Sequence, residues 1–435
     1  MSDALLDPAH ASPIAPGPSW YEATCGARPA YRRLEGERAC DVAVVGGGFC
    51  GLTAALTLAE AGTDVVLLEA ERLGDGASGR NGGQMGRGPR AGVLELEAEL
   101  GRERAAALWN MAEDARRELM ALAQRHGIDM DYRPGQLTPM HRARYEREMR
   151  DEVEAQATRY GNDAVEWLDR DAMATALGSP SYFGGPRDAG TGHIHPLKLV
   201  IGLGRAAAEA GATILERSGV TGIAREGTRY RLTTAAGSVT AERVLVALNG
   251  YHGDLTPGLA RHVLPIQSFI GATGPLPADT DVLPGFEAVD DSRFVVRYFR
   301  KSADNRLLFG GREAYGKATP GDIARVIGKQ IAHVYPQLAG VPLTHAWGGN
   351  VAITMPRHPY VREPQPGMLE AAGFSGHGVM LAGHTGRLAA RYLAGDTEPL
   401  RPLKEMAIPA FPGGTLLRNP LKVLALTWYA MLDRI

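Results

Sequence analysis

Hydrophobic and polar positions near the start of the chain follow first a strand-like and then a helix-like spacing. Asp41-Val42-Ala43-Val44-Val45 is a short apolar run typical of a buried strand, and the alanine-rich segment Leu52 to Ala61 is typical of a helix. A second apolar run, Asp64 to Leu68, ends at the acidic residue Glu69. The pattern therefore predicts a strand, a helix and a second strand in succession.

The two periodicities recur downstream. Helices are predicted over Val93 to His126, about His141 to Arg159, Pro196 to Ala210, near Gly321 to Tyr335, and from Gly378 to about Leu393. Strands are predicted at Ala212 to Glu216, Tyr230 to Thr234, Ser238 to Ala247 and within a β-rich stretch from about Val263 to Gly311. Strands that would complete the first sheet lie near 41, 65, 212, 243 and 369, so we expect that domain to be discontinuous.

The turn between the first strand and its helix reads Gly46-Gly47-Gly48-Phe49-Cys50-Gly51. Its three fingerprint glycines allow a tight turn, a close approach to a pyrophosphate and close packing of helix on strand. The helix N-terminus offers free N–H groups and a positive dipole end to phosphates. Glu69 can accept hydrogen bonds from both hydroxyls of an adenosine ribose and would repel a 2′-phosphate. The pattern predicts a dinucleotide site that disfavours NADP and leaves NAD and FAD open.

Composition and net charge exclude several classes of protein. The 435 residues suffice for two or three domains, and the net charge of −2 gives no electrostatic case for nucleic acid. Cys25, Cys40 and Cys50 fit no zinc or disulfide pattern. His193 and His195 lack further ligands, so we expect a structural role and no metal site. The N-terminal stretch lacks the features of a signal peptide, and no window reaches the roughly 20 apolar residues of a membrane span, which predicts a cytoplasmic protein.

Two further glycine-rich segments carry a family resemblance: Gly76-Ala77-Ser78-Gly79-Arg80-Asn81-Gly82-Gly83-Gln84 and Gly373-Phe374-Ser375-Gly376-His377-Gly378. With the first turn they resemble the D-amino-acid oxidase superfamily of FAD-dependent oxidoreductases, and within it the chain is most similar to the gamma-glutamylputrescine oxidase family. Other matching segments are Ser19-Trp20-Tyr21, Gly192 to Leu197, Asn249-Gly250-Tyr251, Tyr298-Phe299-Arg300, Asp304 to Leu308 and Phe411 to Gly414.

The resemblance implies an α/β fold with a discontinuous, Rossmann-like FAD-binding domain and an α+β substrate domain built on a β-sheet. The FAD-binding domain would comprise residues 36–94, 191–260 and 346–400, and the substrate domain residues 95–190 and 261–345. Residues 1–35 would form an irregular N-terminal arm, and residues 401–435 a C-terminal tail with an apolar helix.

The resemblance also implies which residues hold FAD. The expected cofactor-binding residues are Gly46, Gly48, Phe49, Cys50, Gly51, Glu69, Ala70, Ser78, Gly79, Arg80, Asn81, Gly82, Gly83, Gln84, Val220, Gly250, Gly376, His377, Gly378 and Val379. Backbone amides at the start of the last helix can stabilise negative charge on the pyrimidine edge of reduced flavin. His377 can add a hydrogen bond or a charge there.

Two departures from relatives of the monomeric sarcosine oxidase type are informative. Those relatives attach flavin to a cysteine in the segment that reads Asn350-Val351-Ala352-Ile353-Thr354 here, so we expect non-covalent FAD. They also hold the substrate carboxylate with a lysine at the position of Met380, which argues against sarcosine as the substrate.

The reaction implied is amine oxidation, with hydride transfer from the amine α-carbon to flavin N5 and an imine product that hydrolyses or, if cyclic, persists. The catalytic candidates are His377, Arg300, Tyr298, Trp347 and Tyr251. Arg300 resembles a carboxylate-binding arginine, with a surface salt bridge as the alternative. The three aromatic residues would wall the substrate pocket or, equally, pack in the core.

Several alternatives stay open at this point. The substrate is gamma-glutamylputrescine or a related polyamine derivative, or else a cyclic secondary amino acid such as L-pipecolate. An NAD-dependent reductase and a non-catalytic flavin-binding partner protein are alternatives of other classes. The acceptor is oxygen or a quinone. Residues 419–435 carry an apolar stripe, which is expected either to pack on the body or on a second subunit, or to contact the inner face of the cell membrane. The sequence does not specify the oligomeric state.

Overall fold

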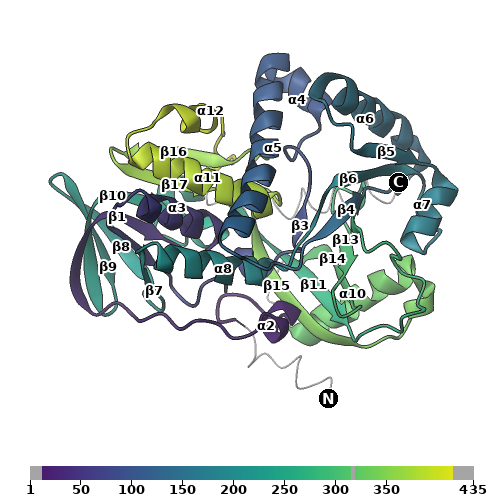
Figure 1. Ribbon diagram of the computed structural model, residues 1–435, viewed down its shortest axis with the longest axis horizontal. Coiled ribbons are helices and arrows are strands. Elements are labelled where there is room, and N and C mark those ends of the chain that lie inside the picture. The colour runs from purple at the N-terminus through teal and green to yellow at the C-terminus, as the bar shows by residue number, and fades with distance from the viewer. Residues whose placement is uncertain (1–11, 315–318, 415–435) are drawn as a thin grey trace.

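The computed structural model describes residues 12–314 and 319–414, which form two sheets with helices packed against them (Figure 1). In the first sheet, parallel strands follow the order β17–β10–β1–β2–β7, and β16 pairs antiparallel with β17 at one edge. The β8–β9 hairpin joins the sheet through β10. The strands are β1 (Gly36–Val45), β2 (Val65–Leu68), β7 (Thr213–Leu215), β8 (Val220–Glu226), β9 (Arg229–Thr234), β10 (Gly237–Val246), β16 (Tyr360–Gln365) and β17 (Met368–Ala372). The five strands predicted for a discontinuous sheet are confirmed.

Alternating side chains of β1 bury both faces of this sheet, as the two-residue period of a strand requires. Val42 and Val44 join a core with helices α3, α8 and α11, which lie together on one face (Figure 1). Ala43 and Val45 join a second core on the opposite face, which includes Tyr230 of the β8–β9 hairpin. The short apolar run of the sequence is therefore a central strand.

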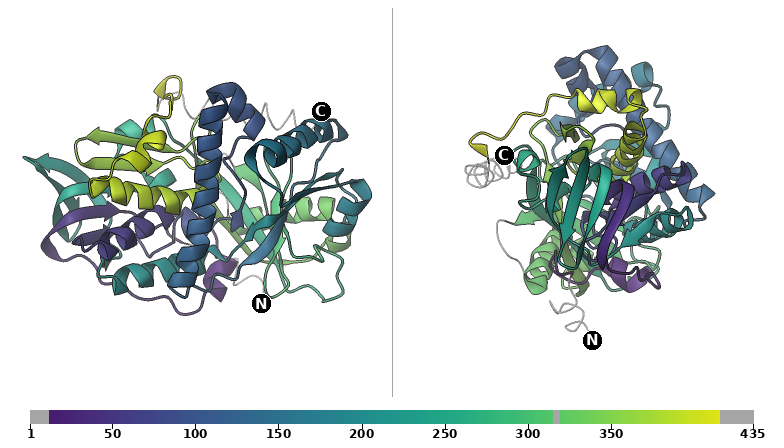
Figure 2. Two further views of the ribbon diagram at one scale, coloured as in Figure 1. Left: turned by 45° about the horizontal axis from the view of Figure 1, so that its top comes forward. Right: turned by 90° about the vertical axis from the view of Figure 1, so that its left-hand side faces the viewer.

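The described helices are α2 (Trp20–Thr24), α3 (Phe49–Glu60), α4 (Val93–Leu100), α5 (Arg102–Arg125), α6 (Glu146–Tyr160), α7 (Arg170–Leu177), α8 (Pro196–Glu209), α9 (Pro257–Ala260), α10 (Pro320–Val334), α11 (Gly378–Leu393) and α12 (Arg401–Lys404). The long helix α5 packs against α11 and runs across the junction of the two sheets (Figure 2). Among the described helices, none is long and apolar enough to cross a membrane.

The second sheet has the strand order β15–β11–β14–β13–β12–β4–β6–β3, with β5 paired to β6. Its pairs are antiparallel except for β4 with β12. Its strands are β3 (Gln84–Met85), β4 (Arg133–Leu137), β5 (Val165–Leu168), β6 (Gly185–His193), β11 (Leu264–Thr273), β12 (Ala288–Asp290), β13 (Tyr298–Lys301), β14 (Leu307–Ala314) and β15 (Leu343–Ile353). Helix α10 covers β11, β14 and β15, and their apolar side chains form a separate core.

Local expectations differ from the structure in three places. The helix predicted from Val93 to His126 is two helices, because Gly101 takes a left-handed backbone conformation (φ +79°) between α4 and α5. The helix predicted from about His141 begins at Glu146. The N-terminal arm is not wholly irregular, since Ser19 accepts a hydrogen bond from the backbone N–H of Glu22 and caps α2.

At two places, the pairing of the strands differs from the domain limits predicted from the sequence. The third FAD-binding segment was expected to begin at residue 346, yet β15 pairs with β11 in the second sheet along almost its whole length, up to Ile353. The short strand Gln84–Met85, expected in the FAD-binding domain, pairs with β6 of the second sheet. The remaining domain limits stay predictions, and the apolar stripe of 419–435 lies outside the described residues.

Candidate active site

The glycine turn after β1 is shaped by backbone contacts that leave no space for side chains. Gly46 has φ +110°, and a Cβ there would lie 2.7 Å from the carbonyl oxygen of Ala247. A Cβ on Gly51 would lie 1.9 Å from the carbonyl oxygen of Gly46. Real Cβ atoms do not approach that closely, so glycine is required at both positions. The turn thereby holds the start of α3 against the ends of β1 and β10.

The N-terminus of α3 presents backbone rather than side chain to its surroundings. Gly48 caps the helix without a side-chain hydrogen bond, and the N–H of Phe49 donates to Oγ of Ser78 at 3.0 Å. A Cβ on Gly48 would lie 2.7 Å from that hydroxyl. Cys50, which follows Phe49, is buried, and burial raises the pKa of its thiol to about 12. This glycine-lined cradle at a positive helix end fits the pyrophosphate of a dinucleotide.

Glu69, at the end of β2, is tied to the turn. Its Oε2 accepts from the N–H of Gly47 at 2.6 Å, and its Oε1 accepts from the N–H of Glu71 at 3.0 Å. Burial raises the pKa of this carboxyl, although the same backbone hydrogen bonds oppose the shift. Beside it, a Cβ on Gly219, which precedes Val220, would lie 3.4 Å from Cβ of Ala70. The carboxylate and the adjacent edge of β8 therefore suit the ribose and adenine of the predicted nucleotide.

The change Glu69→Ala is expected to weaken FAD binding by about tenfold to a hundredfold, because each hydrogen bond to a charged acceptor contributes roughly 1.5–3 kcal/mol. Titration of apoprotein with FAD, followed by flavin fluorescence, measures the effect. Glu71→Ala is the matched control, since only the backbone N–H of Glu71 bonds to Glu69. Equal FAD affinities for the two variants would contradict the assignment.

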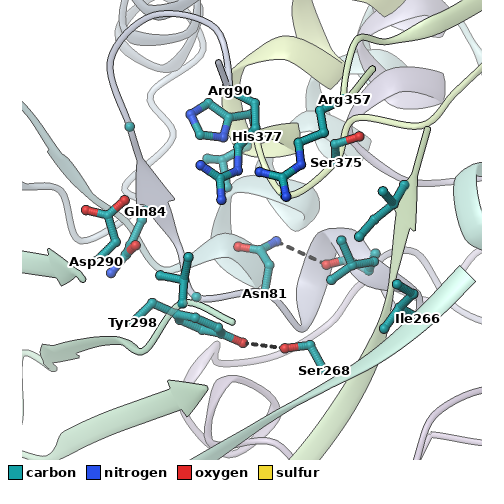
Figure 3. Close-up of a pocket in the computed structure, with 18 of the residues that line it drawn as sticks. Asn81, Gln84, Arg90, Ile266, Ser268, Asp290, Tyr298, Arg357, Ser375 and His377 are labelled. Carbon is teal, nitrogen blue, oxygen red and sulfur yellow. Dashed lines mark hydrogen bonds between the residues drawn. The ribbon is translucent and has the colours of Figure 1, made fainter. Parts of the chain in front are cut away.

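A cavity of about 830 Å³ lies where the two sheets meet (Figure 3). Two of the segments predicted to contact flavin line it, namely residues 80–84 and the start of α11 with Gly376, His377 and Val379. Within the first segment, Asn81 Nδ2 donates to the carbonyl oxygen of Ala77, and Gln84 Nε2 donates to that of Val289. These bonds hold the loop so that it forms a wall of the cavity.

His377 stands at the N-terminus of α11 and faces Gly86, where a Cβ would lie 3.3 Å from its Nε2. Burial, with a smaller contribution from Arg90, lowers the pKa of the imidazole to about 3. His377 is therefore neutral at physiological pH. Of the two roles predicted for it, the structure favours a hydrogen bond over a charge.

Tyr298 is the predicted aromatic residue that lines the cavity. Its hydroxyl lies 3.1 Å from Oγ of Ser268, and its ring covers Gly82 and Gly310, where added Cβ atoms would lie 2.9 and 2.2 Å from ring carbons. The two glycines let the ring lie flat against the backbone, and the hydroxyl pair faces the cavity (Figure 3).

Arg300 does not line this cavity, contrary to the prediction that it binds a substrate carboxylate. Its side chain is buried and donates to the carbonyl oxygens of Gly82 and Ile194 at 2.7 and 2.9 Å. It also donates to the hydroxyl of Tyr21 at 3.1 Å. Arg300 therefore joins the N-terminal arm, the flavin-side loop and the start of α8, which is a structural role.

The other residues predicted to line the substrate pocket form hydrogen bonds to main-chain groups. Trp347 is fully buried, and its Nε1–H donates to the carbonyl oxygen of Arg80 at 3.0 Å. Arg80 itself donates through its guanidinium to the carbonyl oxygens of Pro16, Gly17 and Gly348. The hydroxyl of Tyr251 accepts from the N–H of Asn350. Trp347 lies in the main core, and neither Trp347 nor Tyr251 lines the cavity, so a role for them as pocket walls stays a prediction.

The two histidines considered as metal ligands have structural partners. Nε2 of His193 lies 2.9 Å from the carbonyl oxygen of Phe286. Nδ1 of His195 accepts from the N–H of Lys198 and so caps α8, while its Nε2 lies 3.1 Å from Oγ1 of Thr24. These contacts agree with the structural role predicted for both residues.

Five charged residues that line the cavity were missed by the sequence interpretation, namely Arg90, Glu95, Glu99, Asp290 and Arg357. Arg90 and Arg357 come from loops and Asp290 from the end of β12, far apart in the chain (Figure 3). Asp290 accepts from Nε2 of Gln136 at 2.6 Å and from Oγ1 of Thr138 at 3.0 Å. Burial raises the pKa of this carboxyl, and these hydrogen bonds and Arg90 oppose the shift. Only the density of glycines around Arg90 hinted at a functional loop.

A Rossmann-like sheet with a glycine cradle, joined to a second sheet across a cavity with both apolar and charged walls, is typical of a dinucleotide-dependent oxidoreductase. The chain belongs to the FAD dependent oxidoreductase family, which matches residues 41–392. The cradle around Gly46, Gly48 and Gly51 fits FAD, so FAD is the cofactor, and the NAD-dependent alternative is excluded.

Individual relatives agree with this membership. The chain is 53% identical over 423 residues to "Probable oxidoreductase OrdL" of Rhizobium meliloti (strain 1021), covering 97% of this chain and 99% of that protein. It is 37% identical over 420 residues to "Gamma-glutamylputrescine oxidoreductase" of Escherichia coli (strain K12), covering 96% and 98%. Glycine oxidase from Geobacillus kaustophilus has the same fold, with a TM-score of 0.70, 23% identity and coverage of 87% and 98%.

Proposed function

We propose that this protein oxidises the C–N bond of an amine that resembles gamma-glutamylputrescine. The observation that carries the proposal is a single cavity that joins the flavin-side segments, residues 80–84 and the start of α11, to the charged side chains of Arg90, Arg357 and Asp290. A substrate with charged groups at a distance from the oxidised carbon suits such a cavity. The 37% identity to a gamma-glutamylputrescine oxidoreductase supports the same substrate class.

Bound FAD supplies the acceptor for the hydride that leaves the amine α-carbon. The chain orients the amine through Tyr298 and Ser268, whose hydroxyls face the cavity. Apolar side chains on the cavity wall, such as Leu264 and Ile266, favour the neutral amine over its ammonium form by desolvation. The N-terminal dipole of α11 and the neutral His377 would stabilise negative charge on bound, reduced flavin.

The cavity also bears on the alternative substrate, L-pipecolate. A cyclic amino acid needs a carboxylate clamp close to the oxidised carbon, yet Arg300 lies outside the cavity and Met380 on its wall is apolar. The three cysteines all lie before residue 51, which supports non-covalent FAD. The proposal extends to the electron acceptor, which is oxygen or a quinone. It also includes a cytoplasmic location and peripheral membrane contact through residues 419–435.

Anaerobic mixing of the FAD-loaded protein with a panel of amines tests the substrate class. We expect gamma-glutamylputrescine to bleach the visible absorbance of the flavin rapidly, with an aldehyde as product. Bleaching by L-pipecolate or proline, and none by polyamine derivatives, would move the enzyme to cyclic amino-acid oxidation. A protein that neither carries nor takes up flavin would refute the proposal altogether.

A further inference from the structure

Two arginines in the cavity have no anionic partner in the described part of the chain. The side chains of Arg90 and Arg357 make neither a hydrogen bond nor an ion pair with a described residue, although both line the cavity. Figure 3 shows them reaching from the same side, next to His377. The two guanidinium groups therefore line one cavity with no ion pair to a described carboxylate.

Holding two like charges together costs free energy, and burial increases the cost. Burial lowers the pKa of Arg90, and the charge of Arg357 lowers it further, while Asp290 and Glu95 act in the opposite sense. Neither acid forms a salt bridge with Arg90. An anionic ligand placed between the guanidinium groups would remove this unfavourable repulsion.

The backbone around Arg357 is held in a demanding conformation. Arg357 has φ +60°, a left-handed conformation that favours glycine, and its N–H donates to the carbonyl oxygen of Thr354. Oγ1 of Thr354 donates to the carbonyl oxygen of His358, which closes the turn. The guanidinium lies 4.7 Å from the ring centroid of Phe294. Strained residues that direct a side chain into a cavity commonly serve function.

The acids that line the cavity form no ion pair with Arg90 or Arg357 in the described part of the chain. Asp290 is held by Gln136 and Thr138, and Glu99 lies 3.5 Å from Nε2 of His358. Glu95 lines the cavity without an ion pair to either arginine. The positive side of the cavity is therefore available to a ligand.

We propose that Arg90 and Arg357 form a carboxylate-binding subsite, which selects amines that carry a free carboxylate away from the carbon to be oxidised. The planar fork of each guanidinium can bind a carboxylate through two hydrogen bonds. The inference rests on the proposed function, because it locates the charged end of a gamma-glutamylputrescine-like substrate. It differs from the sequence-based hypothesis, which assigned the carboxylate to Arg300.

Flavin reduction by two amines tests the subsite in Arg90→Gln and Arg357→Gln, with exposed Arg325→Gln as the control. For gamma-glutamylputrescine we expect the concentration at half-maximal reduction rate to rise about tenfold to a hundredfold in each cavity variant, as for a lost hydrogen bond to a charged group. The limiting rate should stay unchanged. Reduction by putrescine, which has no carboxylate, should be unaffected.

A second measurement separates this inference from the proposed function. The butylamide of gamma-glutamate has the carboxylate but no terminal amine, and calorimetry measures its binding to the FAD-loaded protein. If gamma-glutamylputrescine fails to reduce the flavin but the butylamide binds only when both arginines are present, the subsite stands and the proposed function falls. Failure of the butylamide to bind the unaltered protein would overturn the inference.

The alternative anionic ligand for Arg90 and Arg357 is the FAD cofactor itself. If the arginine variants lose FAD affinity or shift the flavin reduction potential, with no change in the concentration dependence for gamma-glutamylputrescine, the pair serves the flavin and the inference is wrong. Unaltered behaviour of both variants would also overturn it.

Discussion

Replacement of Gly46 by alanine is expected to yield protein that no longer retains FAD. The backbone of Gly46 has φ +110°, and an added Cβ would lie 2.7 Å from the main-chain oxygen of Ala247. Main chain cannot move aside as a flexible side chain can, so the turn must shift away from β10. The amides of α3 would move with it, and we expect FAD affinity to fall at least about a hundredfold, as for the loss of two charged hydrogen bonds.

Gly211 provides a matched control for this substitution. It precedes β7 in the same sheet and has nearly the same backbone angle, φ +104°, but an added Cβ would meet nothing within 4 Å. Gly211→Ala should therefore cost only the conformational penalty of about 1–2 kcal/mol and keep its FAD. Measurement of the flavin-to-protein absorbance ratio and of FAD affinity compares the two. Retention of FAD by both variants would show that the contact with Ala247 does not define the cradle.

The change Arg300→Met should destabilise the fold and leave substrate binding nearly intact. Arg300 is buried, and its removal leaves the carbonyl oxygens of Gly82 and Ile194 without these donors. Each buried acceptor left unsatisfied costs about 1–3 kcal/mol. We expect a clear fall in the thermal unfolding temperature, measured at saturating FAD because the loop at Gly82 also lines the cavity.

Kinetics then distinguish this role from the one predicted for Arg300 from the sequence. If Arg300 bound the substrate carboxylate, Arg300→Met would raise the half-saturating concentration of gamma-glutamylputrescine and leave the stability of the fold unchanged. The structure predicts that the variant instead loses stability and keeps its substrate binding. Arg325→Met serves as the control, because Arg325 is exposed and bonds only to Asp322 one turn away. A stable Arg300→Met protein with weakened substrate binding would restore the original hypothesis.

Much of the first sheet followed from the sequence, because local chemistry determines it. The continuous apolar run Val42 to Val45 marks a strand buried on both faces, and glycine is required where an added Cβ would collide with main chain, as at Gly46 and Gly51. Residues 80–84 and His377, for which the resemblance implies contact with flavin, line one cavity, and that contact stays a prediction.

The sequence by itself thus determined the fold class and the cofactor, while the place of the flavin stays a prediction. Only the tertiary structure decided which charged side chains reach the cavity. Arg300 and Arg90 are both arginines near glycine-rich or aromatic segments, yet one donates to buried carbonyl oxygens and the other lines the cavity without a hydrogen bond or ion pair to a described residue. The physical reason is that a charged side chain takes its role from its partners, and residues 90, 290 and 357 meet only once the distant loops have packed together.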